Sequence, residues 1–367
     1  MARKFVPNPF IDLGQGLTMG IEEVYNKISI SNSEFVAHTQ AAFDFLNTAL
    51  NWAGIGVWLF YFVSGYIIFS AQDAFYKDNP VGFLKNRIVR IYPTMWLCLT
   101  ISIIVIYFSG QNNLYNLYNN DASLFNYGIK EIIYSYSIVG GFLSSTSWSP
   151  LPQGFTTTVE VQFYLIAFSL FILAGRIPQK TQLIFFIAGL LCLISYLLIE
   201  LTGTQYRFFG AFRFSPLFVL GASIFLENKN KNRGVWNKLI LASALILSIH
   251  LILSTEGSSG YEGFSLVEDR TNSAISCMIF IGAFYWLTNI SVQGKLKTAD
   301  RILGELTYPM YLIQIPMLAL ALGHFEDDGL MGWVLLFLFC IALSAIINLG
   351  FERRFYSLRQ HIRGKPL

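Results

Sequence analysis

The 367-residue sequence has little charge, because only 13% of its residues are Asp, Glu, Lys or Arg, whereas 54% are hydrophobic and 16% are aromatic. Soluble domains carry roughly a quarter of charged residues. The composition therefore excludes an ordinary soluble fold and predicts a multi-pass membrane protein. The net charge of +3 is also small, which argues against nucleic acid as a partner. The lipid bilayer is the first partner we expect, and nothing in the sequence indicates an oligomeric state.

The sequence also lacks paired cysteines. Its four cysteines stand singly inside apolar stretches, a pattern that supports neither a disulfide framework nor a zinc site. No repeat of fixed period is visible, and residues 1–20 lack the uninterrupted apolar core of a signal peptide. We therefore expect no metal and no cleaved leader.

Long apolar stretches are what the sequence has in abundance. A spanning helix needs about 20 mostly apolar residues. Nine stretches meet this requirement: 54–72, 91–108, 158–175, 182–199, 208–226, 238–254, 273–290, 302–322 and 330–350. Residues 25–48 are a more polar candidate, kept provisionally as a first span. The predicted fold class is an all-α transmembrane helix bundle of about ten spans. Residues 25–355 form its domain, between cytoplasmic segments 1–24 and 356–367.

The distribution of basic residues gives an independent test of this topology. With ten spans and both termini in the cytoplasm, most of the 25 basic residues fall in cytoplasmic segments, whereas loops 255–272 and 323–329 are mainly acidic. This satisfies the positive-inside rule and places Arg87 and Arg90 in the cytoplasm. The rule requires residues 1–53 to contribute one crossing or none, and does not decide between them.

Arg87 and Arg90 are the first candidates for a binding site. They lie one helical turn apart, directly before an apolar stretch that begins with Tyr92 and Pro93. Guanidinium groups bind phosphate oxygens in a fixed, two-pronged geometry, so a pair at the cytoplasmic mouth suits a phosphorylated ligand. Anchoring of the span and contact with lipid head groups explain the same spacing, and both interpretations stay open.

Three other polar residues fall at membrane depth, where such residues are costly and mark functional candidates. His38 would lie in the outer half of the first span, where a neutral imidazole can act as a general base; a place in an interfacial loop is the alternative. Glu160 follows three threonines and either caps a helix or orients a histidine. Arg213 either contacts substrate or pairs with Glu160.

Several segments, taken in order, resemble the acyltransferase-3 family of integral membrane acyltransferases. Lys27 and His38 are similar to its pattern of a basic residue followed by a histidine. The other segments that carry the resemblance are GIGVWLFYFVSGYIIF, KNRIVRIYPTMWL, FTTTVEVQFYLIAF, AFRFSPLFVLGASIF, LGELTYPMYLIQIPML and FERRF. Together they cover the chain from about residue 27 to residue 355.

The resemblance implies an enzyme that takes an acyl group, commonly acetyl, from cytosolic acyl-coenzyme A. Its acceptor would be a hydroxyl of a surface or periplasmic glycan, such as a polysaccharide or lipopolysaccharide, and its location the bacterial inner membrane. His38 would deprotonate the acceptor or carry the acyl group itself. The implied site residues are Lys27, Arg87, Arg90 and Tyr92 for the donor, His38 and Glu160 for catalysis, and Tyr164, Arg213 and Gln314 for the acceptor.

The sequence departs from the family pattern at three places. Phe155 stands where tryptophan is usual, Gln314 stands where histidine is common, and the first segment is polar rather than strongly apolar. Two alternatives are therefore kept: a catalytically inactive family member, and a transporter in which Glu160 and Arg213 mark a substrate path. Transporters often show repeated halves, and none is visible here.

Overall fold

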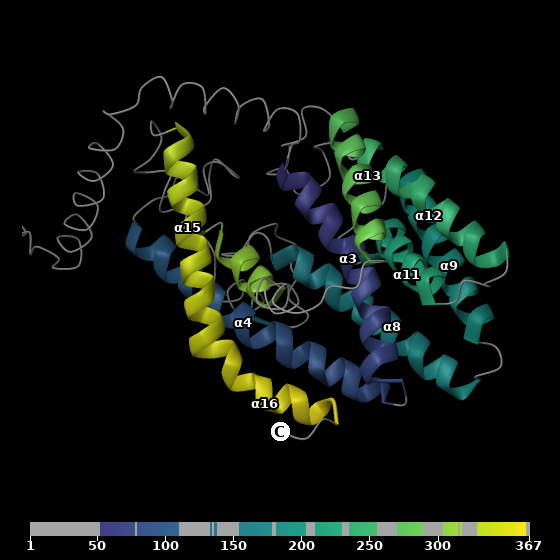
Figure 1. Ribbon diagram of the computed structural model, residues 1–367, viewed down its shortest axis with the longest axis horizontal. Coiled ribbons are helices and arrows are strands. Elements are labelled where there is room, and N and C mark those ends of the chain that lie inside the picture. Colours follow the sequence, from purple (N-terminus) through teal and green to yellow (C-terminus); the bar gives the residue numbers. More distant parts are fainter. Residues whose placement is uncertain are drawn as a thin grey trace, which may run out of the picture.

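The computed structural model describes residues 52–77, 79–109, 133, 136–137, 154–177, 181–202, 210–229, 235–254, 270–288, 304–314, 316–317 and 329–364. All regular elements within these ranges are helices (Figure 1). They are α3 (Trp52–Phe75), α4 (Pro80–Ser109), α8 (Gly154–Arg176), α9 (Thr181–Thr202), α10 (Gly210–Arg213), α11 (Ser215–Lys229), α12 (Val235–Ser254), α13 (Arg270–Leu287), α15 (Gly329–Ile347), the π-helix η3 (Asn348–Glu352) and α16 (Arg353–Ile362). Residues 304–314 are also helical.

The all-α prediction is confirmed for the described part of the chain, where each of the nine apolar stretches falls on a helix. Five helical stretches there are long and apolar enough to cross a bilayer: Pro80–Val105, Thr156–Arg176, Thr181–Thr202, Val235–Ser254 and Val334–Ile362. The candidate first span, 25–48, lies outside the described residues. The count of ten spans and the cytoplasmic position of both termini remain predictions.

Two boundaries differ from the hydropathy pattern. Helix α4 begins at Pro80, well before the apolar stretch at residue 91, so Arg87 and Arg90 lie inside one helix with the span that follows. The stretch 208–226 is divided between α10 and α11. Pro216 lies in the first turn of α11, where a missing N–H is tolerated. It therefore marks a new helix start directly after Arg213.

Helices α3 and α11 share the most extensive helix-to-helix contact in the described structure. Gly65 and Gly221 make the close approach possible, because a Cβ atom on Gly65 would overlap the carbonyl oxygen of Phe218, and one on Gly221 would overlap that of Phe62. Small residues serve this purpose widely in membrane helix pairs. The crossing therefore fixes α3 against α11.

Replacing Gly65 or Gly221 by alanine is expected to destabilise the protein by about 1–3 kcal/mol or more through overpacking. The backbones of α3 and α11 would have to separate to accept the new methyl group. Gly175→Ala and Gly282→Ala are matched controls, because a Cβ atom at either position meets no other atom within 4 Å. Thermal unfolding in detergent checks this. A Gly65→Ala melting temperature equal to that of the controls would show that the crossing is looser than described.

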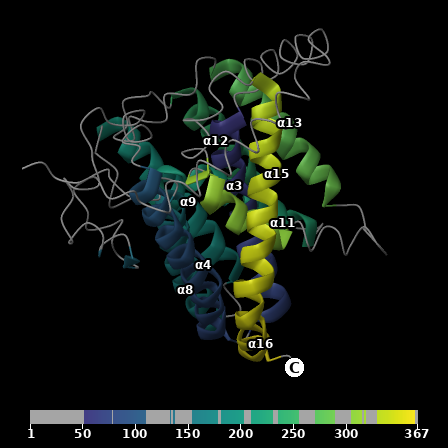
Figure 2. The same cartoon turned by 90° about the vertical axis from the view of Figure 1, so that its left-hand side faces the viewer.

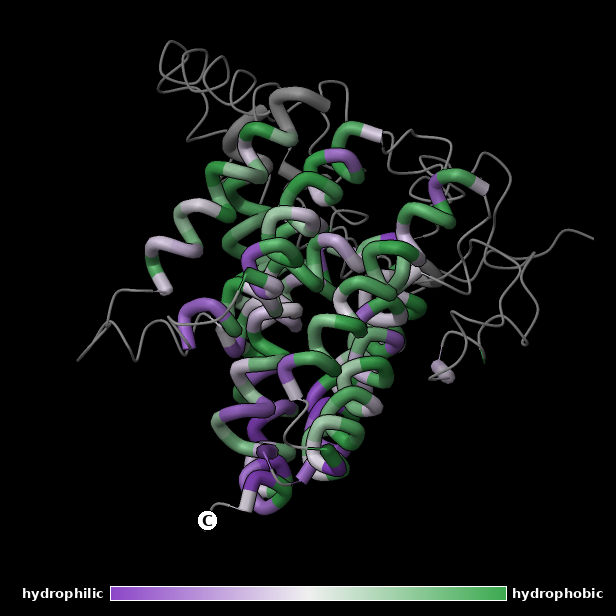
Figure 3. The backbone as a smooth tube through the Cα atoms, turned by 90° about the vertical axis from the view of Figure 1, so that its right-hand side faces the viewer, coloured by the Kyte–Doolittle hydropathy of each residue, from purple (hydrophilic) through white to green (hydrophobic). Residues whose placement is uncertain are grey.

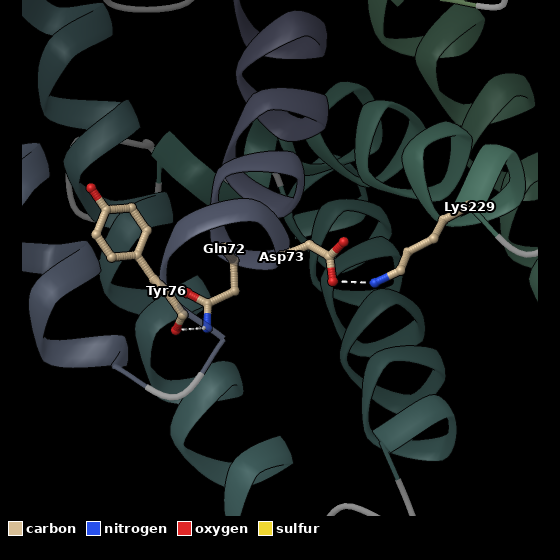
Figure 4. Close-up of polar contacts among 4 residues, drawn as sticks. All are labelled: Gln72, Asp73, Tyr76 and Lys229. Atoms are coloured by element: carbon tan, nitrogen blue, oxygen red, sulfur yellow. Dashed lines mark hydrogen bonds and ion pairs between the residues drawn. The ribbon is translucent and has the colours of Figure 1, made fainter. Parts of the chain in front are cut away.

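One end of the bundle is hydrophilic. Hydrophilic stretches gather at the end that carries the C-terminus, below predominantly hydrophobic helices (Figure 3). Helix α16 lies at this same end (Figure 2). Helix α16 continues from α15 through η3 and packs against α4. Lys229, at the end of α11, forms an ion pair with Asp73 near the end of α3, and Gln72 Nε2 donates to the Tyr76 carbonyl oxygen at 2.7 Å (Figure 4). The C-terminal ends of α3 and α11 therefore lie together.

Candidate active site

Arg87 lies buried between two helices. Only 5% of its surface is exposed, and its guanidinium carbon lies 5.3 Å from the ring centroids of both Phe83 and Tyr164. Phe83 precedes Arg87 by one turn of α4, whereas Tyr164 comes from α8. Aromatic faces stabilise a cation that has lost its water. The position holds the guanidinium charge inside the protein, which bilayer anchoring alone does not require.

Glu160 lies one turn before Tyr164 on the same face of α8 and is also buried. The hydroxyl of Tyr164, one turn further along the helix, donates a hydrogen bond to its Oε1. Ser64 Oγ, from α3, donates to the same oxygen at 3.4 Å. A buried carboxylate is costly unless it is hydrogen-bonded and faces positive charge. Both conditions are met, because Arg87 and Arg90 interact with Glu160 electrostatically.

These contacts form one continuous network across three helices, from Arg87 of α4 through Tyr164 and Glu160 of α8 to Ser64 of α3. The sequence analysis placed Glu160 at membrane depth and the arginine pair at the cytoplasmic mouth. The structure brings the carboxylate and Arg87 onto the two sides of one tyrosine side chain. Glu160 therefore belongs to the same site as the arginines.

Tyr92 is buried on α4, where its ring packs against Trp96 at a centroid distance of 5.9 Å. The helix of residues 304–314 lies alongside, because Tyr308 donates from its hydroxyl to the Ile91 carbonyl oxygen at 3.2 Å. Tyr311 of the same helix accepts a hydrogen bond from Thr156 Oγ1 of α8 at 2.9 Å. This segment closes the site across α4 and the start of α8. Gln314, at its end, is exposed.

Arg213 is buried at the end of α10, with 8% of its surface exposed. Helix α10 is tied to α8 by the backbone N–H of Ala211, which donates to Gln162 Oε1 at 2.8 Å. Residues two apart on a helix do not share a face, so this bond holds α10 against α8 but does not by itself bring Arg213 to Glu160. Its pairing with Glu160 or with substrate stays a prediction.

Lys27 and His38 lie outside the described residues, so their predicted roles are untested. Within the described ranges, no group of three or more His, Cys, Asp or Glu side chains is arranged to hold a metal ion.

Sequence reasoning missed several contributors to the site. Single hydroxyl groups from other helices contact the site residues or their neighbours on α4 and α8. They belong to Ser64, Tyr308 and Tyr311. No spacing in the local sequence reveals such contacts. Only the position of Tyr164, four residues after Glu160, carries a signal, since residues at that spacing share a helix face.

The match to known families decides how these residues are interpreted. Residues 34–349 match the acyltransferase domain of the acyltransferase-3 family. The chain belongs to the acyltransferase-3 family. No curated protein and no solved structure matches it. The acyltransferase-3 match includes His38, both arginines of α4, and Glu160, whereas Lys27 and all of α16 lie beyond its limits.

Family membership and the apolar helices together identify an integral membrane acyltransferase. In this acyltransferase, the motif segments quoted from the sequence are neighbours in space: the Arg87 segment of α4, the Glu160 segment of α8 and the Tyr308 segment contact one another. The polar core of the bundle is thus built from the segments that resemble the family.

Proposed function

We propose that the protein is a membrane O-acyltransferase that moves an acyl group, in the first instance acetyl, from cytosolic acyl-coenzyme A to a hydroxyl of a surface or periplasmic glycan. The observation that carries this is the joining of Arg87 to Glu160 through Tyr164 inside a membrane bundle of this family. The proposed location is the bacterial inner membrane, with several spans.

The donor side of the proposal rests on Arg87 and Arg90. Coenzyme A carries phosphate groups, for which a guanidinium fork is a fitting ligand. Arg90 is half-buried, one turn along α4 from the buried Arg87. The two groups together exceed the charge of Glu160, which leaves a net positive potential for an anionic donor. Lys27 and Tyr92 are further proposed donor contacts.

The chemistry proposed at the acyl group is transfer from sulfur to oxygen. The thioester C–S bond breaks and an ester C–O bond forms, while the proton of the acceptor hydroxyl passes to His38 and then to the departing thiolate of coenzyme A. In the alternative with two steps, the neutral His38 ring first takes the acyl group as the C–S bond breaks, and its ring proton passes to the departing thiolate. The acceptor hydroxyl then takes the acyl group from the ring nitrogen, and the hydroxyl proton returns to the ring. Electrons and protons balance in both.

Glu160 is proposed to act by position and charge. Its buried carboxylate stabilises Arg87 through Tyr164, and an adjacent histidine that gains a proton would be stabilised by the same charge. Tyr164, Arg213 and Gln314 are the proposed acceptor contacts. Among these, Tyr164 and Arg213 are buried and Gln314 is exposed.

The proposal is tested by measuring how fast free coenzyme A thiol is released from acetyl-coenzyme A when a glycan acceptor is present. Tyr164→Phe removes the hydroxyl but keeps the ring beneath Arg87, so we expect kcat to fall about tenfold, as for loss of one hydrogen bond to a charged group. Glu160→Gln should cost more, because the charge disappears.

The two substitutions should be non-additive, because Tyr164→Phe deletes the same hydrogen bond that Glu160→Gln weakens by removing the charge of its acceptor. Ser169→Ala on α8 is a matched control, since the Ser169 hydroxyl is exposed and only returns a bond to the Leu165 carbonyl oxygen. Full activity in Glu160→Gln would remove Glu160 from the site. Binding of coenzyme A without any transfer by the wild type would instead indicate an inactive family member.

A further inference from the structure

Helix α16 lies beyond residue 349, where the family match ends, yet it packs along the part of α4 that carries Arg87. It is strongly basic and begins with Arg353 and Arg354, both exposed. The positive-inside rule interprets these arginines only as residues that keep the C-terminus in the cytoplasm. The structure gives a third arginine of the helix, Arg359, a different position.

Side-chain contacts at both ends hold α16 in place. At its start, Glu352 accepts hydrogen bonds from Thr94 Oγ1 of α4 at 2.6 Å and from Asn348 Nδ2 at 2.9 Å. At its end, Arg363 Nε donates to the Tyr76 hydroxyl at 3.3 Å, and its guanidinium lies 5.1 Å from the centroid of the Phe75 ring. The Thr94 bond therefore ties the start of α16 to α4, and the Arg363 contacts tie its end to the C-terminal end of α3.

A contact in the middle of α16 places Arg359 next to the donor site. Asn86, the neighbour of Arg87 in the sequence, donates from Nδ2 to the Arg359 carbonyl oxygen at 3.0 Å. The side chain of Arg359 interacts electrostatically with Arg90, Arg363 and Arg87. Glu352 is the one acidic group among these interactions. The four arginines are therefore close enough for their charges to influence one another, and they form a cluster around the contact of α16 with α4.

The charges in this cluster are not balanced within the described residues. Arg359 Nε is fully buried and has no hydrogen-bond partner there, and a buried donor without a partner is costly. Like charges brought together in a partly buried place also repel one another. A bound anion with several oxygen atoms would remove both costs.

We propose that Arg359 is a third arginine of the phosphate-binding site of Arg87 and Arg90, and that α16 thereby completes the site for a ligand with more than one phosphate group. The inference rests on the proposed function, which supplies acyl-coenzyme A as that ligand. The same chemistry occurs in the head groups of anionic phospholipids, so the experiment must separate the two sources.

The test uses the full chain in nanodiscs of phosphatidylcholine, a zwitterionic lipid without net charge, with coenzyme A binding measured by calorimetry. Arg359→Gln should weaken binding by about 10- to 100-fold, the value of a lost charge-assisted hydrogen bond. Arg354→Gln removes the same charge from an exposed position of the same helix, and we expect a change of no more than about twofold. Arg359→Lys keeps the charge without the fork and should fall between them, which keeps the test valid if the glutamine variant fails to fold.

The possible outcomes separate the inference from the proposed function. If Arg359→Gln binds coenzyme A like the wild type while the double change Arg87→Ala, Arg90→Ala does not bind, the inference is overturned and the donor site stands. If the wild type ignores coenzyme A but phosphatidylglycerol raises its melting temperature only when Arg359 is present, the cluster holds lipid phosphate. In that case neither Arg359 nor the pair Arg87 and Arg90 binds the donor, and the proposed function fails together with the inference.

Discussion

Replacing Arg87 and Arg90 together by alanine is expected to raise the KM for acetyl-coenzyme A about 100-fold or more, since two charge-assisted hydrogen bonds to phosphate are lost. The value of kcat should change much less, because the phosphates bind equally in the ground state and the transition state. Initial rates over a range of donor concentrations check this split.

The matched control is the pair of lysine substitutions, Arg87→Lys and Arg90→Lys. Lysine keeps the positive charge that orients the span, but it lacks the planar fork. If the arginines only anchored the topology, the lysine variant would behave as the wild type. We expect it instead to show a KM raised about tenfold for loss of bidentate geometry, and a wild-type KM would contradict the donor role.

Replacing His38 by alanine is expected to lower kcat by about 10²- to 10⁴-fold, the usual contribution of a general base, while leaving donor binding intact. His361→Ala is a matched control, because His361 is exposed on α16. Without an acceptor, labelled acetyl-coenzyme A can transfer its acetyl group only to the protein itself or to water. Such labelling of the wild-type protein but not of His38→Ala would select the acyl-histidine route. An unchanged kcat in His38→Ala would place the base elsewhere in the chain.

Hydropathy predicted the helices because a bilayer demands long apolar segments with internally bonded backbones. It failed at the start of α4, where Lys85, Asn86 and Arg87 interrupt the apolar pattern although the helix continues through them. A polar helix that is stabilised by its neighbours has no apolar signature.

The site was predictable only where its residues lie on one helix. The face shared by Arg87 and Arg90, and that shared by Glu160 and Tyr164, follow from helical periodicity. The meeting of Arg87 with Tyr164, and the arrival of Ser64 and Arg359, depend on how separate helices pack. Positive-inside counting treated Arg359 as a topology signal, since that rule does not consider contacts.

The most direct test of the central claim is acyl transfer by the wild-type protein reconstituted in sealed vesicles. Labelled acetyl-coenzyme A is supplied on the face that carries α16 and the C-terminus, and a glycan acceptor is enclosed on the other. The account predicts label on the enclosed glycan, in amounts that fall when Arg87 and Arg90 are both replaced by alanine. The account would be contradicted if the folded protein neither hydrolysed the donor nor labelled the glycan.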